Sequence, residues 1–347
     1  MNDARQSLRV TAITQVDEWV RCYRLEAAQP DGKLAPFLPG QYLNIFYEID
    51  GSTTSRPYSI ASSPKDAEQG FYELFIHGGG GFTSPWLFRH IAMGDMLSCS
   101  YPEGTFCYRP GCDSTHLVAV SGGMSVTPLR AFARAVVDGS LDVDLTVFCG
   151  WDYCHEVLFM DEFLQYAQEC PRFRVVFAVA KEPCPKAVHG YVDRKLIESY
   201  TTLQNATLFL CGPEEMYRFL SQELAPCRIP AGRWRREIPG EIKTPLGQPD
   251  APPVQKGSVS LTLRRQGQAV RLRAGREESL LVALERAGVQ PKARCRSGRC
   301  GYCLARLLAG EVYVPAAWDT RTPQQKAERK IHPCCSFPLS DVVLEAE

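Results

Sequence analysis

Three cysteines near the C-terminus stand at a spacing that strongly restricts how this region folds. They are Cys295, Cys300 and Cys303, in the order C-x4-C-x2-C, with Gly298 and Gly301 between them. This spacing is typical of thiolates that hold a [2Fe–2S] cluster, because a tight glycine-containing loop turns three sulfurs toward one small cluster. A zinc site or unliganded thiols are the alternatives, although zinc sites usually pair C-x2-C units. A fourth thiolate must come from elsewhere in the chain.

The composition and the N-terminal residues indicate the cellular compartment of such a centre. The 15 cysteines are an odd number, and residues 1–10 carry charges without an apolar stretch typical of an export signal. We therefore expect reduced thiols and a metal centre in a cytoplasmic protein. No run approaches about 18 apolar residues, which predicts no membrane span. The formal net charge is zero, and we expect no nucleic acid among the partners.

Residues 1–112 predict a β-rich domain. Short segments that alternate or run apolar are separated by turn residues such as Pro39-Gly40. Short, evenly spaced strands with such breakers are typical of an antiparallel β-barrel. We expect strands at 10–14, 19–25, 42–47 and 71–76.

Residues 113–229 predict a different architecture, in which apolar strands alternate with helices. Fully apolar strands in this alternation are typical of a buried parallel sheet, so we expect an α/β domain. The expected strands are 117–120, 145–149, 173–179 and 207–211, and the expected helices are 129–137, 160–169 and 213–224.

Residues 230–257 contain six prolines and no usable periodicity, which predicts a linker. The remaining residues, 258–347, predict a third domain with a hairpin over 258–272, a helix over 280–287 and a strand near 342–344. We thus expect a multi-domain chain with domains at 1–112, 113–229 and 258–347.

Residues 258–347 resemble the plant-type ferredoxin family, which implies an α+β β-grasp domain around the cluster. In that family the fourth ligand lies four residues before a proline and seven before an aspartate. Cys334 satisfies both distances, to Pro338 and Asp341, whereas Cys335 satisfies neither. The resemblance therefore implies four metal ligands: Cys295, Cys300, Cys303 and Cys334.

Basic side chains gather in this ferredoxin-like region. Residues 258–347 hold 15 Lys and Arg against 9 Asp and Glu, and Arg294, Arg296 and Arg299 surround the cysteines. We hypothesise that these arginines form a docking face for an acidic acceptor or for the acidic remainder of the chain.

Residues 1–238 resemble the ferredoxin–NADP reductase superfamily. One motif that carries the resemblance is R-x-Y-S, which follows P-G-Q-Y at 39–42. The resemblance implies that Arg56 binds the flavin phosphate and that Tyr58 contacts the ribityl chain and the ring. It also implies that Ser59 lies at flavin N5 and takes part in catalysis.

A second flavin motif is G-F-T-S-P-W-L at 81–87. The resemblance implies that Ser84 contacts the flavin and that Gly81 lets the backbone approach the phosphates. A helix beginning near Ser84 would add free N–H groups for an anion. The segment 101–106 resembles the G-x-F stretch of FAD-binding members, so an FAD-binding antiparallel β-barrel domain is expected. FMN is the alternative, because one branch with the same domain order uses it.

The predicted strand at 117–120 leads into Gly122 and Gly123, with Thr127 four residues further on. Such a strand–turn–helix junction brings backbone N–H groups to a pyrophosphate, which predicts an NAD(P)-binding domain. The superfamily pattern is G-G-x-G-x-T-P, and Ser125 stands here in place of the third glycine. Either the backbone is less free at this point, or the Ser125 hydroxyl donates to the phosphate.

A second nicotinamide motif is C-G-P, formed by Cys211, Gly212 and Pro213. The resemblance implies that the glycine and proline allow close approach of the ring and that Cys211 acts at the hydride-transfer site. A buried core thiol is the alternative. Asp152 follows the strand at 145–149, and no Lys or Arg lies within 151–156. An acidic residue there accepts from ribose hydroxyls and repels a 2′-phosphate, which favours NADH over NADPH.

These three sites in one chain predict an oxidoreductase. A nicotinamide delivers two electrons as hydride, a [2Fe–2S] cluster accepts one, and a flavin exchanges either number. The order implies an NAD(P)H-dependent reductase that passes electrons through flavin and cluster to an acceptor protein, such as an oxygenase or another metalloenzyme. The alternative is an electron-transfer or redox-sensing subunit of a larger complex with little NAD(P)H turnover of its own.

Overall fold

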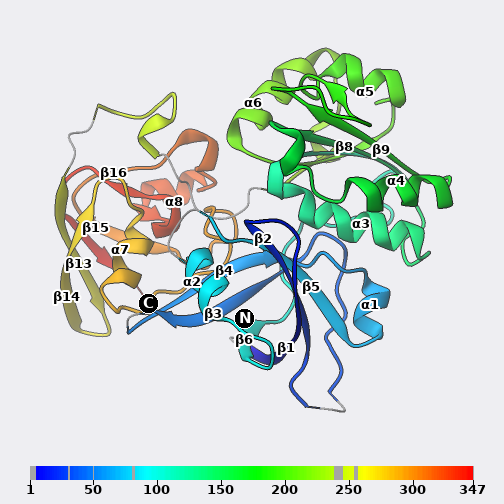
Figure 1. Cartoon of the computed structure of the whole chain (residues 1–347). Coiled ribbons are helices and arrows are strands. Elements are labelled where there is room, and N and C mark those ends of the chain that lie inside the picture. The colour runs from blue at the N-terminus through cyan, green and yellow to red at the C-terminus, as the bar shows by residue number, and fades with distance from the viewer. Residues whose placement is uncertain are drawn as a thin grey trace. The chain divides into compact units, whose positions relative to one another are not determined.

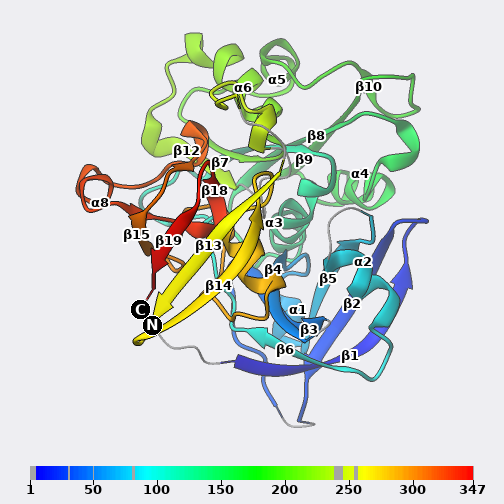
Figure 2. The same ribbon diagram turned by 90° about the vertical axis from the view of Figure 1, so that its left-hand side faces the viewer.

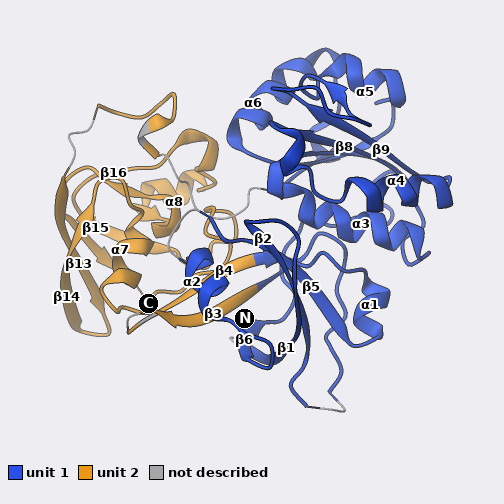
Figure 3. Ribbon diagram, in the orientation of Figure 1, with its two compact units in different colours: residues 1–43, 58–238 blue, residues 44–57, 239–347 orange. Residues whose placement is uncertain are grey.

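The computed structural model of the chain describes residues 5–29, 32–49, 51–79, 83–237, 245–253 and 257–346. The chain forms two compact units, which Figure 3 distinguishes by colour. Unit 1 comprises Met1–Leu43 and Tyr58–Ile238, and unit 2 comprises Asn44–Pro57 and Pro239–Glu347. Part of a hairpin from the N-terminal third therefore groups with the C-terminal region.

The N-terminal third contains a six-stranded sheet in the order β4-β3-β6-β1-β2-β5. Strand β1 pairs antiparallel with β2 and β6, and β2 pairs antiparallel with β5. In β1, buried Leu8 and Val10 alternate with exposed neighbours, as expected for a strand with one face in the core. The antiparallel fold predicted from the sequence is confirmed. The strands are β1 (Arg5–Gln15), β2 (Val20–Ala27), β3 (Tyr42–Ile49), β4 (Ser52–Ser59), β5 (Phe71–His77) and β6 (Met96–Ser100).

Two short helices accompany this sheet. Helix α1 (Pro64–Glu68) begins with a capping box, in which the Ser63 side chain accepts from Asp66 N and the Asp66 carboxylate accepts from Ser63 N. Helix α2 (Thr83–His90) places Ser84 in its first turn, which meets the condition for free N–H groups there.

Residues 116–237 form a parallel six-stranded sheet in the order β10-β9-β8-β7-β11-β12. Helices α3 and α4 lie on one face and α5 and α6 on the other, which explains why the inner strands are mostly apolar and buried (Figures 1 and 2). The predicted α/β domain is confirmed. Its elements are β7 (His116–Gly122), α3 (Thr127–Val137), β8 (Asp144–Trp151), α4 (Met160–Glu169), β9 (Phe173–Val179), β10 (Val188–His189), α5 (Arg194–Tyr200), β11 (Thr207–Cys211), α6 (Glu214–Glu223) and β12 (Trp234–Glu237).

Three of these elements differ from the sequence-based expectation: the two-residue strand β10, helix α5 and strand β12. Helix α5 buries only Ile197, so its apolar periodicity is too weak to recognise. Strand β12 lies within residues 230–257, which the sequence predicts to be a linker. Its residues Trp234–Glu237 are largely charged, and they become a strand because β11 pairs with them in parallel register. Tertiary pairing, and not the local pattern, therefore decides this strand.

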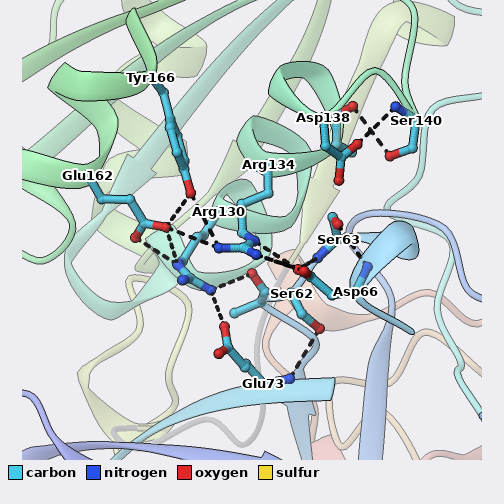
Figure 4. Close-up of polar contacts among 12 residues, drawn as sticks. Ser62, Ser63, Asp66, Glu73, Arg130, Arg134, Asp138, Ser140, Glu162 and Tyr166 are labelled. Atoms are coloured by element: carbon cyan, nitrogen blue, oxygen red, sulfur yellow. Dashed lines mark hydrogen bonds and ion pairs between the residues drawn. The ribbon is translucent and has the colours of Figure 1, made fainter. Parts of the chain in front are cut away.

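A buried arginine joins helices α3 and α4 to strand β5 within unit 1 (Figure 4). Arg130 of α3 is 7% exposed and donates to Glu73 of β5 at 2.8 Å, to Glu162 of α4 at 2.8 Å and to the carbonyl of Ala61 at 2.9 Å. Burial alone would lower the pKa of Arg130, but the carboxylates of Glu162 and Glu73 raise it. The two modules of unit 1 are thus fixed together by paired buried charges.

Unit 2 contains a five-stranded mixed sheet in the order β14-β13-β19-β15-β17, with a two-stranded ladder of β16 and β18. The hairpin of β13 and β14 is the long yellow pair in Figure 2. Helix α7 is capped by Ser279 and buries Leu280, Leu281 and Leu284. This sheet and helix confirm the predicted α+β domain. The elements are β13 (Ser258–Arg265), β14 (Gln268–Gly275), α7 (Leu280–Arg286), β15 (Ala305–Ala309), β16 (Val312–Tyr313), α8 (Pro323–Ala327), β17 (Lys330–Ile331), β18 (Phe337–Pro338) and β19 (Val342–Glu345).

Within the described ranges, no helix combines the length and the apolar character needed to cross a bilayer.

Candidate functional site

Four cysteines of unit 2 form two pairs. The sulfurs of Cys303 and Cys334 are 3.4 Å apart, and the thiol of Cys300 is hydrogen-bonded to Cys295. In a four-cysteine [2Fe–2S] cluster each iron takes two protein thiolates, so two such pairs fit two irons. Among the described residues, no three His, Cys, Asp or Glu side chains are grouped to hold one metal ion. The pairing of the four thiols is the feature that fits a two-iron cluster.

The backbone of the loop explains its glycines. Gly298 and Gly301 have φ values of 74° and 70°, a region that favours glycine. A Cβ added to Gly298 would lie 2.7 Å from the Cys335 sulfur and 2.9 Å from the Trp318 carbonyl oxygen. The Gly298 N–H also donates to the sulfur of Cys334 at 3.2 Å. This glycine thus lets the loop close and directs an N–H group to a candidate ligand.

The environment of Cys295 favours the form that binds iron. The pKa of Cys295 is lowered to about 5, first because Cys300 donates a hydrogen bond to its sulfur. The backbone N–H of Cys300 donates to the same sulfur at 3.3 Å. Metals bind the thiolate, so these donors prepare the position for coordination.

The neighbouring cysteines 334 and 335 have different surroundings. Cys334 contacts Cys303 and Gly298, whereas the thiol of Cys335 donates to the main-chain carbonyls of His332 at 3.6 Å and Trp318 at 3.9 Å. Both are buried. We keep Cys334 as the proposed fourth ligand, with Cys335 packed beneath the loop.

The expected role of Arg296 in docking on a separate acceptor protein is wrong, whereas its bond to Thr54 of β4 is a contact with the N-terminal part of the chain. Its side chain is completely buried and pairs with Glu285 of α7, so it is unable to meet a partner surface. Arg299 is exposed and Arg294 is partly exposed. The count of basic residues misled the interpretation, because charge composition does not distinguish a buried cation from a surface cation.

The flavin motifs lie on β4 and α2. Arg56 and Tyr58 are two residues apart on β4 and share one of its faces, and Ser59 ends that strand. The hydroxyl of Tyr58 lies 3.3 Å from that of Ser84, so the two predicted flavin motifs meet in the fold. Gly81 lies outside the described residues.

The two nicotinamide motifs meet at the carboxyl edge of the parallel sheet, where β7 and β11 are neighbours. A Cβ added to Gly122 would lie 2.9 Å from Pro213 Cδ and 3.8 Å from Gly212 Cα. A Cβ added to Gly212 would lie 2.3 Å from the side chain of Met216. Gly122 is therefore required for close approach to the Pro213 ring, whereas at Gly212 the contact is with the flexible end of Met216. The contact with Met216 is one that the sequence alone does not reveal.

In the turn after β7, an anion can approach the backbone at Gly123. Gly123 has a φ of 57°, and a Cβ added there would meet nothing within 4 Å. The hydroxyl of Thr127, at the start of α3, donates to the Met124 carbonyl at 3.3 Å. Ser125 is hydrogen-bonded to the thiol of Cys211. Ser125 thus connects the two nicotinamide motifs. The sequence alone left two roles open for this residue.

Cys211 ends β11 and is 1% exposed. Burial raises the pKa of its thiol well above the usual value, and Glu237 adds to the shift. The thiol is therefore neutral at physiological pH. A neutral group next to a nicotinamide is suited to packing and weak hydrogen bonding, and not to proton abstraction.

Asp152 follows β8 and pairs with Lys181 at 2.6 Å. The lysine comes from the segment after β9, 29 residues away. The folded site therefore contains a basic residue that the segment 151–156 lacks. Cys154 and Cys184 form a disulfide between the same two segments. For this pair the expectation of reduced thiols is wrong.

Comparison with known proteins agrees with this geometry. An oxidoreductase FAD-binding domain matches residues 7–108, an oxidoreductase NAD-binding domain matches 119–222, and a 2Fe-2S iron-sulfur cluster binding domain matches 263–339. The fold and the site thus define a flavin- and nicotinamide-dependent oxidoreductase with an iron–sulfur domain. FAD, the flavin expected from the sequence, is the cofactor of the first matched domain.

The chain belongs to the ferredoxin–NADP reductase superfamily. It is 30% identical to ferredoxin–NADP reductase B of Sorangium cellulosum over 224 residues, which are 62% of this chain and 89% of that protein. It is 25% identical to the glycine betaine monooxygenase reductase subunit of Pseudomonas aeruginosa over 359 residues, covering 99% and 96% of the two chains. The structure of phthalate dioxygenase reductase matches with a TM-score of 0.72 at 18% identity, covering 99% and 98%.

Proposed function

We propose that this protein is the NADH-dependent reductase component of an oxygenase. Hydride would pass from NADH to FAD, and electrons would then pass singly through the [2Fe–2S] cluster to the oxygenase. The proposal depends on one observation. The chain that brings four cysteines together in two pairs also brings Gly122 and Gly212 together at the edge of its parallel sheet. The Pseudomonas aeruginosa relative, which matches over nearly the whole chain, is itself called a monooxygenase reductase subunit.

The proposed residue roles follow the geometry of each site. Arg56 would bind the flavin phosphate, Tyr58 and Ser84 would contact the flavin, and Ser59 would lie at its reactive nitrogen. Support for this comes from the meeting of Tyr58 and Ser84 at 3.3 Å. At the nicotinamide edge, Gly122, Gly123, Thr127, Gly212 and Pro213 would bind the nucleotide beside Cys211.

NADH is the proposed donor because of Asp152. Its carboxylate is a suitable acceptor for ribose hydroxyls and repels a 2′-phosphate. The pair with Lys181 holds that carboxylate at the end of β8. The proposal places the protein in the cytoplasm, where NADH is available.

Anaerobic reduction by NADH tests the function. The purified protein should contain one flavin and about two irons per chain. NADH should bleach the flavin absorbance within seconds and then reduce the cluster, as followed by its electron paramagnetic resonance (EPR) signal. A Cys300→Ser variant should still bleach its flavin but should lose NADH-driven reduction of cytochrome c, a one-electron acceptor. Flavin that stays oxidised for minutes in NADH would contradict the proposal and support an electron-transfer subunit without turnover of its own.

A further inference from the structure

One carboxylate in unit 2 is shared by two arginines. Glu285 of α7 is 4% exposed and accepts from both terminal nitrogens of Arg296, one of them at 3.0 Å. Arg296 directly follows the candidate ligand Cys295 and has a φ of 55°, which is unusual for a residue with a side chain. The pairing thus fixes the first turn of the cluster loop.

The same carboxylate reaches the strand that carries the flavin motif. Nη1 of Arg56 lies 3.6 Å from Glu285 Oε2. Thr54, also on β4, adds a second shared partner, because its hydroxyl oxygen accepts from Arg56 at 2.8 Å and from Arg296 at 3.3 Å. Two arginines from distant parts of the sequence therefore meet at one carboxylate and one hydroxyl.

This arrangement is rigid for two physical reasons. A two-pronged arginine–carboxylate contact fixes orientation as well as distance. In addition, the carboxylate and the Arg296 guanidinium are almost fully buried, and a buried charge that loses its partner is strongly destabilised. Neither Arg296 nor Glu285 is thus free to move independently of the other.

We propose that Glu285 is a positioning residue for electron transfer from the flavin to the cluster. By holding Arg296 and Arg56 together, it keeps the cluster loop at a fixed place against β4, next to the arginine proposed for the flavin phosphate. This inference rests on the proposed function. In the step concerned, the reduced flavin loses one electron and one iron changes from ferric to ferrous. The second electron follows after the cluster has passed the first to the acceptor.

The first test compares Glu285→Gln with Glu278→Gln in the holoprotein. Glu278 is the control because it lies in the same unit and pairs with the exposed Arg286, outside the network. In single turnovers with NADH, Glu285→Gln should bleach its flavin at the wild-type rate. It should then reduce its cluster several-fold more slowly, because electron tunnelling between two centres falls steeply as their separation grows. Glu278→Gln should match the wild type in both phases.

Two further readouts separate positioning from general stability. The EPR spectrum of the dithionite-reduced cluster should change in Glu285→Gln, because the loop next to Cys295 loses its charged partner. Thr54→Val should slow cluster reduction whereas Thr54→Ser, which keeps the hydroxyl, should not. This pair keeps the proposal testable if Glu285→Gln fails to fold.

The inference fails if cluster reduction in Glu285→Gln or Thr54→Val equals that of the controls, or if both phases slow in proportion. Such a result would leave the proposed function intact. Conversely, a wild-type flavin that NADH does not reduce would refute the proposed function before any variant is compared.

Discussion

Arg130 of α3 and Glu73 of β5 form an ion pair of 2.8 Å that joins the nicotinamide module to the antiparallel sheet within unit 1. Glu162 approaches the same guanidinium from α4 at 2.8 Å, so one buried cation holds three elements (Figure 4). Together with the neighbouring pair of Arg134 and Asp66, this side chain fixes the two modules relative to each other.

We expect Arg130→Met to lower the free energy of unfolding of unit 1 by about 3–5 kcal/mol, because it leaves two carboxylates without their buried partner. Urea unfolding followed by circular dichroism measures this. Asp161→Asn is the matched control, since its pair with Lys186 is exposed and should change stability by less than about 1 kcal/mol. Equal destabilisation by both substitutions would contradict the assigned role.

The two adjacent cysteines should respond differently to substitution. Cys334→Ser should reduce the iron content from about two atoms per chain to less than one, because one iron loses a thiolate. Cys335→Ser should retain iron and the visible absorbance of the cluster. Iron analysis of anaerobically purified protein checks both, and retention of iron in Cys334→Ser with loss in Cys335→Ser would reverse the assignment.

Gly122 and Pro213 lie so close at the nicotinamide edge that an added methyl group on Gly122 should weaken nucleotide binding. In Gly122→Ala the new Cβ would lie 2.9 Å from the Pro213 ring. Overpacking of this kind costs about 1–3 kcal/mol, which corresponds to a Kd for NAD⁺ raised about 5- to 150-fold. Isothermal titration measures the Kd. Gly232→Ala, where an added Cβ meets nothing within 4 Å, should bind like the wild type.

The choice of nucleotide should depend on the balance between Asp152 and Lys181. Asp152→Asn should raise kcat/KM for NADPH relative to NADH by at least about fivefold, because it removes about 1 kcal/mol of repulsion and leaves the lysine beside the 2′-phosphate. Lys181→Met should shift the ratio the other way. Steady-state kinetics with both nucleotides measure the ratio, and an unchanged ratio in both variants would place the ribose elsewhere.

Alkaline pH should destabilise unit 1 through its buried thiols. Burial raises the pKa of Cys99 from 9.0 to about 12, so its stabilising effect is complete below about pH 9 and is lost as the pH rises toward 12. Each such thiol should cost about 1.4 kcal/mol per pH unit above the unfolded pKa. Cys99→Ala should therefore lose less stability than the wild type between about pH 8 and pH 10 in urea titrations. The exposed Cys112→Ala should lose as much as the wild type, and identical losses in all three proteins would refute the prediction.

The sequence by itself predicted the fold class and most of its elements. Apolar runs such as 117–120 and turn glycines such as Gly298 encode local conformation directly, and the cysteine spacing 295–300–303 restricts the loop before any folding is considered. Long-range contacts are different. Lys181 beside Asp152, β12 against β11, and Arg56 with Arg296 at Glu285 join residues that are tens to hundreds of positions apart. Only packing of the whole chain brings such groups together, because no local sequence pattern records which distant residues will meet.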